Sequence, residues 1–321
     1  MSTPIYTFAA CSDKGTVRQN NEDNFFIQGQ APMPTAASDH YSTFSANLSE
    51  GVAAVFDGMG GEAYGASASS LLARLLASNP QAVLRAGDRA VPQYVERANT
   101  LVCEMQKEKK ARIGSTMTIA SVTSDSVTVY NLGDSPAYLF SGSSLKKLSR
   151  DHTVAQQLVN LGILSPEQAA SDNRRHQLTQ HIGVDPSEMA LSAHNSGAFP
   201  FGPGDCLLLC SDGVTEGLSE SDIAKILSAG TTAERLASTI VDCAIRGGSR
   251  DNVTAVVVKA AGAPYDHAYE AEPTIDNGIN PVFASSEKKK LSNVKTAILW
   301  TLCILLSFGI GMLLPLILEL L

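Results

Sequence analysis

The sequence predicts an α+β fold in which antiparallel sheets are covered by paired helices. Strand-like segments follow one another in runs, and long helical segments come two at a time between those runs, which disfavours a βαβ alternation. The hydrophobic content of 44% is sufficient for a packed core. Acidic residues outnumber basic residues by 32 to 24, and the resulting net charge of -8 argues against a nucleic-acid binder.

Eight segments have the short apolar or alternating pattern of β-strands. They are residues 5–11, 24–29, 52–56, 115–123, 126–132, 137–140, 206–210 and 253–259. Residues 123–126 indicate a hairpin turn between two of these strands. The uninterrupted apolar run CLLLC at 206–210 indicates a strand whose two faces are both covered.

Four helices are expected in two pairs, over residues 63–78 and 90–110 and over residues 219–227 and 232–246. The third of them begins with Ser-Glu-Ser-Asp, a typical N-terminal cap. Residues 153–175 are interpreted as a helix and a turn. The globular domain is expected to occupy residues 1–262. Residues 263–295 combine proline, glycine, acidic residues and then lysines, which predicts a flexible linker.

Residues 296–321 are predicted to form one transmembrane helix. Residues 297–318 are 22 uncharged residues that would span about 33 Å as a helix, against about 30 Å of membrane hydrocarbon. A buried core helix is the alternative, but it would normally show a polar face. Lys288, Lys289, Lys290 and Lys295 precede this segment, so we expect a single-pass membrane protein whose N-terminal body lies in the cytoplasm.

Acidic residues recur beside glycine or at the ends of the predicted strands. They are Glu22, Asp23, Asp57, Asp134, Asp212 and Asp251. Any one of them alone is more typical of a turn, but five such sites at strand edges are poorly explained by five independent turns. Carboxylates that gather at one place repel one another unless a cation compensates, and oxygen ligands favour Mg²⁺ or Mn²⁺. The six cysteines form no CxxC pair, which disfavours a zinc site.

Eight stretches of the chain, in order, resemble the metal-dependent Ser/Thr protein phosphatases of type 2C in their bacterial form. They are SDKGTVRQNNEDN, VFDGMGG, GSTMT, YNLGDSPAYLF, LSRDHT, HQLTQHIG, GDCLLLCSDGVTE and SRDNVTAVVV, between residues 12 and 258. The resemblance implies an αββα sandwich with a site for two Mn²⁺ or Mg²⁺ ions at one sheet edge. It also implies a signalling hydrolase that cleaves phosphoserine and phosphothreonine by direct attack of a metal-bridging hydroxide.

The resemblance assigns metal ligands residue by residue. Asp57 matches the aspartate that bridges two ions, and Gly58 matches the residue that offers its carbonyl to one of them. Asp212 and Asp251 match ligands of the first ion. Asp134 matches a residue that, together with Asp212, can hold a third ion in bacterial members.

Three further residues receive roles from the resemblance. Glu22 matches an acidic residue near the second ion, and Asp23 matches its ligand or a partner of that ligand. Arg18 matches the arginine that grips the substrate phosphate, a task that suits the bidentate guanidinium. Arg18 and Asp57 are thus the expected catalytic residues, whereas the histidines His152, His176 and His181 are expected to be structural.

Two function classes remain open at this point. The first is an active phosphatase at the inner face of a membrane, acting on phosphorylated proteins, with a Ser/Thr kinase and its targets as partners. The alternative is a catalytically weak pseudophosphatase that serves as a phosphoprotein-binding scaffold. The joint presence of Asp57, Asp212 and Asp251 favours the first, because an inactive chain could lose any of them. A partner-switching phosphatase would usually carry a sensor domain, which the sequence does not indicate.

Overall fold

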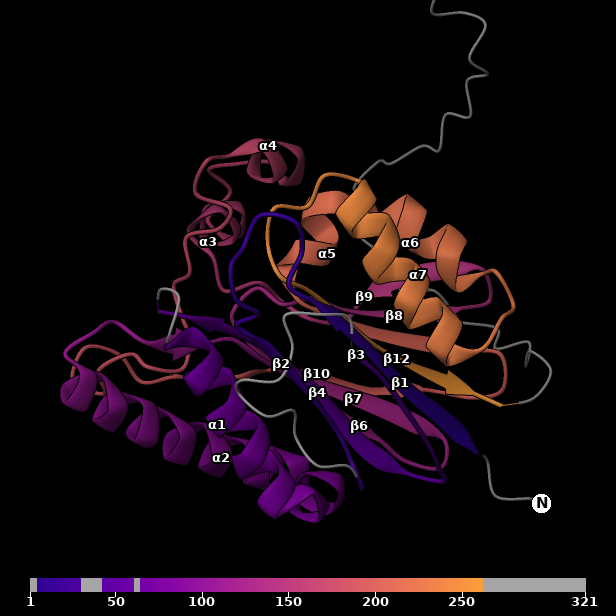
Figure 1. Ribbon diagram of the computed structural model, residues 1–321, viewed down its shortest axis with the longest axis horizontal. Helices are drawn as coiled ribbons and strands as arrows, with labels where there is room; N and C mark the ends of the chain where they lie inside the picture. Colours follow the sequence, from indigo (N-terminus) through magenta and orange to yellow (C-terminus); the bar gives the residue numbers. More distant parts are fainter. Residues whose placement is uncertain (1–4, 30–41, 61–63, 262–321) are drawn as a thin grey trace, which may run out of the picture. The chain divides into compact units, whose positions relative to one another are not determined.

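The computed structural model describes residues 5–29, 42–60 and 64–261 (Figure 1). All of them belong to the first of two units into which the chain divides, Met1–His267. The predicted linker at 263–295 and the predicted membrane helix at 296–321 lie outside the described residues. Within the described residues, no helix combines the length and the apolar character that crossing a membrane requires.

The first sheet contains both ends of the domain. Its strand order is β3-β1-β12-β11-β8-β9, and the pairings between neighbours are antiparallel. The strands are β1 (Tyr6–Asp13), β3 (Ser42–Leu48), β8 (Ala137–Ser141), β9 (Ser144–Lys147), β11 (Cys206–Cys210) and β12 (Val253–Ala260). Each residue of β11 is buried, which confirms a central strand that is covered on both faces.

The second sheet is also antiparallel, with the order β10-β7-β6-β4-β2. Its strands are β2 (Asp23–Ile27), β4 (Gly51–Met59), β6 (Met117–Val122), β7 (Ser126–Leu132) and β10 (His194–Pro200), and the short β5 (Gly114–Ser115) pairs with β4. The expected hairpin is present between β6 and β7, where the amide of Thr123 donates to the carbonyl of Ser126.

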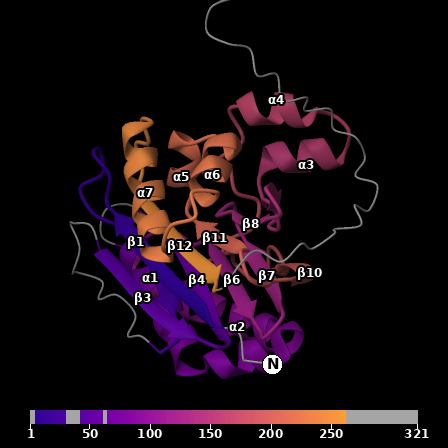
Figure 2. The ribbon, with the colours of Figure 1, turned by 90° about the vertical axis from the view of Figure 1, so that its right-hand side faces the viewer.

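Helices cover the outer face of each sheet (Figures 1 and 2). The helices α1 (Gly65–Ser78) and α2 (Pro80–Lys109) pack on the second sheet, and α5 (Asp212–Gly217), α6 (Glu220–Leu227) and α7 (Ala233–Arg246) pack on the first. A third apolar cluster lies between the sheets and includes Phe8, Val55 and Leu207. The four layers are therefore helix, sheet, sheet and helix, as the sequence resemblance implied.

Residues 153–175 form two short helices, α3 (Val154–Asn160) and α4 (Pro166–Ser171), which lie to one side of the layers (Figure 1). Thr153 caps α3, and Ser165 caps α4 in a reciprocal pair with Gln168. The segment exposes two large apolar side chains, Leu161 and Ile163, between the helices. The sequence predicted one helix and a turn in this segment, and the structure has two short helices.

The strand register places acidic residues together at one edge of the sandwich. In the second sheet, Asp23 on β2 lies opposite Asp57 on β4. In the first sheet, Cys210 pairs with Ala255, so that Asp212 after β11 and Asp251 before β12 leave the sheet at the same end. Antiparallel pairing accounts for this meeting, because the end of one strand adjoins the start of its neighbour.

Candidate active site

A cavity of about 640 Å³ opens where these strand ends meet. Five of the six predicted acidic residues line it: Glu22, Asp57, Asp134, Asp212 and Asp251. Gly58 and Arg18 also line it. Asp23 is not among the described lining residues. We call this cavity the carboxylate pocket.

Asp57 is held at the end of β4 by the backbone of the neighbouring β5–β6 segment. The hydroxyl of Thr116 accepts a hydrogen bond from the Asp57 amide (3.0 Å), and the Thr116 amide donates to the Asp57 carbonyl (2.8 Å). The next residue, Gly58, lies so close to α1 that an added Cβ would come within 2.2 Å of the Gly65 carbonyl oxygen. Only glycine fits there, which keeps the backbone beside Asp57 open to the cavity.

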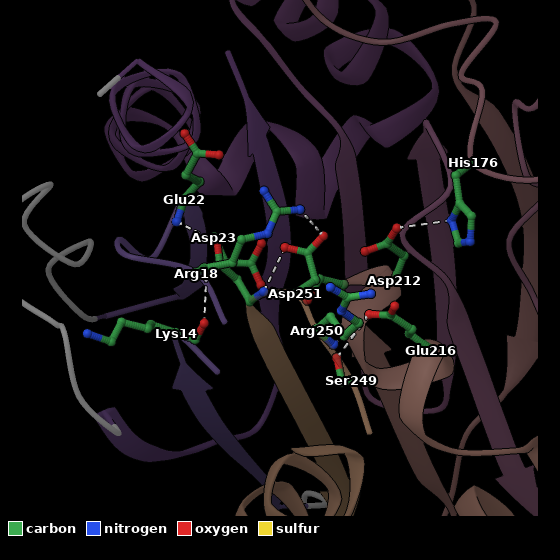
Figure 3. Close-up of polar contacts among 12 residues, drawn as sticks. Lys14, Arg18, Glu22, Asp23, His176, Asp212, Glu216, Ser249, Arg250 and Asp251 are labelled. Carbon is green, nitrogen blue, oxygen red and sulfur yellow. Dashed lines mark hydrogen bonds and ion pairs between the residues drawn. The ribbon is translucent and has the colours of Figure 1, made fainter. Parts of the chain in front are cut away.

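Asp212 and Asp251 come from the first sheet. Ser211 precedes α5, and its hydroxyl donates to the carboxylate of Asp23 (2.6 Å) and accepts from the amide of Thr254 (3.0 Å). These bonds tie the start of α5 to the first residues of β12. The loop that carries Asp251 is fixed from the other side by Glu216, whose carboxylate accepts from the Arg250 amide (2.9 Å; Figure 3).

Arg18 reaches the pocket from the loop between β1 and β2. Its guanidinium donates to the Asp251 carboxylate (2.5 Å), and Figure 3 shows the two side chains directed at each other. Asn252 holds this loop in place through three hydrogen bonds. Its amide nitrogen donates to the carbonyls of Lys14 and Asn20, and its amide oxygen accepts from the backbone of Glu22.

The third side of the pocket is formed by Asp134, which follows β7, and by His176. Nδ1 of His176 lies 3.5 Å from an oxygen of Asp212, and the imidazole points at that carboxylate (Figure 3). Hydrogen bonding to Asp212 raises the pKa of His176. Asp134, His176 and Asp212 each offer one ligand atom, and these three atoms lie within 4.8 Å of one another. His176, expected from the sequence to be structural, thus lines the site.

Glu22 and Asp23 differ in position. Glu22 lines the pocket, and its carboxylate packs against Gly65 at the start of α1. Asp23 is buried, with 4% of its surface exposed, and it accepts the hydrogen bond of Ser211. Of the two sequence readings of Asp23, ligand or partner of a ligand, its burial behind the pocket favours the second.

The carboxylates repel one another strongly. Burial, and then the charges of Asp23, Asp212, Asp134 and Asp251, raise the pKa of Asp57 well above its usual range. Burial and neighbouring aspartates likewise raise the pKa of Asp23 and of Asp134 to about 7. Burial and then Asp212 raise the pKa of Asp251, although Asn252 and Arg18 counteract part of that effect.

This donor set fits divalent cations. Six carboxylate side chains line one cavity, and Arg18 is the one arginine or lysine among its described lining residues. A bound divalent cation would remove the repulsion that now raises the pKa values. Carboxylate oxygens favour Mg²⁺ or Mn²⁺, and the single imidazole of His176 favours Mn²⁺ over Mg²⁺ at its side of the pocket.

Residues 13–158 match the Protein phosphatase 2C family. The chain is 30% identical over 275 residues to the Serine/threonine protein phosphatase PstP of Mycobacterium tuberculosis. The aligned region covers 82% of this chain and 46% of that protein. The chain therefore spans about half the length of that relative. The chain is also 28% identical over 256 residues to the Serine/threonine phosphatase stp of Listeria monocytogenes. That aligned region covers 77% of this chain and 93% of the Listeria protein.

A solved structure of similar fold is the catalytic domain of the serine/threonine protein phosphatase PstP in complex with two manganese ions. The two folds superpose with a TM-score of 0.63 at 26% identity, over 81% of this chain and 100% of the other. Its manganese content agrees with the chemistry that the carboxylate pocket of this chain indicates.

Proposed function

We propose that the chain, which matches the protein phosphatase 2C family over residues 13–158 and is similar to bacterial serine/threonine phosphatases, is a metal-dependent phosphatase of phosphoserine and phosphothreonine in proteins. The observation that carries the proposal is the convergence of Asp57, Asp134, Asp212 and Asp251 on one cavity that also receives Arg18. The pseudophosphatase alternative is not favoured, because an inactive chain could have lost Asp57, Asp212 or Asp251 and this chain has all three.

Each residue of the pocket has a distinct task in this proposal. Asp57, Asp212 and Asp251 would hold two divalent cations, with Gly58 contributing its carbonyl, and Asp134 with Asp212 would hold a third. Bound cations supply charge neutralisation and lower the pKa of water, which is the chemistry that phosphoester hydrolysis needs. No cysteine or serine nucleophile is required.

Arg18 would bind the substrate phosphate. Its guanidinium already donates to a carboxylate, and the same planar set of N–H groups matches two oxygens of a phosphoryl group. Asn252 keeps the arginine in reach of the pocket by anchoring its loop on both sides of Arg18, at Lys14 and at Asn20. The chain thereby prepares the position of the phosphate before substrate arrives.

The direct test measures phosphate released from a phosphothreonine peptide by the purified chain, with and without Mn²⁺. We expect hydrolysis with Mn²⁺ or Mg²⁺, its loss in EDTA, and its loss at saturating Mn²⁺ in Asp57→Asn, which changes one oxygen ligand without changing size. Activity that persists in EDTA, or in Asp57→Asn, would refute the proposal.

The proposal also includes membrane attachment, with the phosphatase domain on the cytoplasmic side. It is supported by the uncharged run at residues 297–318 and by the lysines before it. The full-length chain should then stay with membranes in high salt and carbonate, whereas a chain that ends at Pro281 should be released. Quantitative release of the full-length chain by salt would contradict the attachment, because salt screens charge but does not extract a buried helix.

A further inference from the structure

A second hollow of about 450 Å³ lies beside α3 and the first residue of β10. Its charged and titratable lining residues are Arg150, Asp151, His152 and His194, and α3 contributes the neutral side chains of Gln157 and Asn160. We call it the basic hollow. None of these residues has a task in the proposed hydrolysis.

The charges of the basic hollow are not balanced. Its carboxylate, Asp151, is already paired with Lys147 at 2.7 Å. The guanidinium of Arg150 forms no ion pair or hydrogen bond with any residue that the structure describes. Burial, followed by His194, lowers the pKa of His152, and burial with Arg150 lowers that of His194. The hollow therefore holds one guanidinium without an ion-pair partner and two imidazoles, while its carboxylate is paired with Lys147.

The hydrogen bonds of the two imidazoles fix how they can bind. The amide of Gly133 donates to Nδ1 of His152 (3.1 Å), so the neutral ring carries its proton on Nε2 and can donate from that atom. His194 is hydrogen-bonded to the backbone of Leu148. Nε2 of His152 and the bidentate guanidinium of Arg150 supply donors for an oxyanion. The neutral ring of His194 already gives its N–H to Leu148, and it would gain a second donor on protonation, which a bound oxyanion favours.

Adjacent residues of the chain line the basic hollow and the carboxylate pocket. Leu178 lines the pocket and Thr179 lines the hollow. Asp134 lines the pocket, while Gly133 before it is bonded to His152 of the hollow. Thr153, the residue before α3, forms an isolated β-bridge with Leu178. Because neighbouring residues line the two cavities, and an extended peptide advances about 3.3 Å per residue, we place a second oxyanion a few residues from the phosphoresidue.

We propose that the basic hollow binds a second oxyanion of the phosphoprotein substrate, an acidic side chain or another phosphoryl group a few residues from the phosphoresidue. The inference rests on the proposed phosphatase function and adds a substrate class to it. The phosphoryl group that is cleaved would enter the carboxylate pocket, while the neighbouring oxyanion would contact Arg150 and the two histidines.

The test uses phosphothreonine peptides in which one glutamate is moved through successive positions on both sides of the phosphoresidue, within an alanine background. We expect KM to be about three- to tenfold lower at one or two positions, the range for a charge-assisted contact that is partly exposed. A second phosphothreonine at that position should match or exceed glutamate. Free inorganic phosphate at the same concentration should not stimulate the parent peptide, which separates a substrate-borne oxyanion from a free one.

The variants Arg150→Gln and His194→Gln should remove the KM preference while leaving hydrolysis of p-nitrophenyl phosphate unchanged. The matched control is Arg85→Gln, which removes an exposed arginine of α2 that does not line the hollow and should keep the preference. His152 is left intact because it supports Gly133.

Equal KM values at all positions, or a preference that survives in the Arg150→Gln/His194→Gln double variant, would overturn the inference. Failure of the proposed function is a different result, since the wild-type chain would then hydrolyse neither the peptides nor p-nitrophenyl phosphate in Mn²⁺.

Discussion

The carboxylate pocket and the basic hollow are lined by adjacent residues, Leu178 and Thr179, yet the two cavities are built differently. The pocket is assembled from strand ends of both sheets, and its side chains are locked by buried partners such as Ser211, Thr116 and Asn252. The hollow is assembled from α3, a loop and an edge strand, and its arginine is exposed. Buried charge carries a large electrostatic cost, whereas exposed charge is screened, so substitutions should have large effects in the pocket and modest ones in the hollow.

The largest difference should appear within the pocket itself. Asp212→Asn should lower kcat about 10²- to 10³-fold, because Asp212 would serve the central pair of ions and lies between Asp251 and His176. Asp134→Asn should cost less, since Asp134 would serve only the third ion. Steady-state rates at saturating Mn²⁺ measure both, and an equal loss, or a greater loss for Asp134→Asn, would show that this ranking is wrong.

Asn252→Ala should reduce activity by about 10- to 100-fold, a typical result when a residue that orients metal ligands is removed. Asn252 would touch neither substrate nor metal, so the effect must pass through Arg18 and the Asp251 loop. KM for the phosphopeptide should therefore rise together with the apparent dissociation constant for Mn²⁺. A loss of thermal stability with unchanged KM and Mn²⁺ affinity would reduce Asn252 to a structural residue.

Arg18→Ala should raise KM for a phosphopeptide by about tenfold, more than it lowers kcat, if the guanidinium binds the phosphate of the ground state. Arg18→Lys retains the charge without the bidentate geometry and should fall between wild type and alanine. Should kcat alone decrease in both variants, Arg18 would instead act on the transition state.

The pH dependence of stability gives a smaller but diagnostic effect. The pKa values of Asp23 and Asp134 are raised to about 7 in the folded metal-free domain, whereas an unfolded aspartate has its usual value near 3.9. Stabilisation by their protonated forms is therefore lost as the pH rises through about 7. The thermal midpoint in EDTA should fall between pH 6 and pH 8, and saturating Mn²⁺ should prevent the fall. A midpoint in EDTA that rises over this range would contradict the raised pKa values of these two aspartates.

The sequence predicted the buried strands more reliably than the exposed ones. The ranges 126–132 and 206–210 are observed without change as β7 and β11, because their apolar residues are uninterrupted or alternate regularly. It missed β3, β9 and β10, which are all edge strands and carry exposed polar residues, and β10 also contains glycine and proline. The first turns of α2 were missed because a kink with non-helical geometry at Ala86 separates them from the rest.

The candidate site divides in the same way. The acidic residues were recognisable from their position at strand ends or beside glycine, and the structure brings five of them into one cavity. Thr116, His176, Glu216 and Asn252 were not recognised as parts of it. Their contribution depends on contacts that local sequence cannot reveal, such as the bond from the Glu22 amide to Asn252, which joins residues 230 positions apart.

The central claim is that the carboxylate pocket is a cation site, and calorimetric titration of the metal-free chain with Mn²⁺ tests it most directly. We predict at least two ions per chain, with proton release that increases below pH 7 as the aspartates give up their protons. Asp57→Asn should lose the tightest binding, while Arg150→Gln in the basic hollow should bind Mn²⁺ as wild type does. Binding of Mn²⁺ that is absent in the wild type, or that is unchanged in Asp57→Asn, would contradict the account.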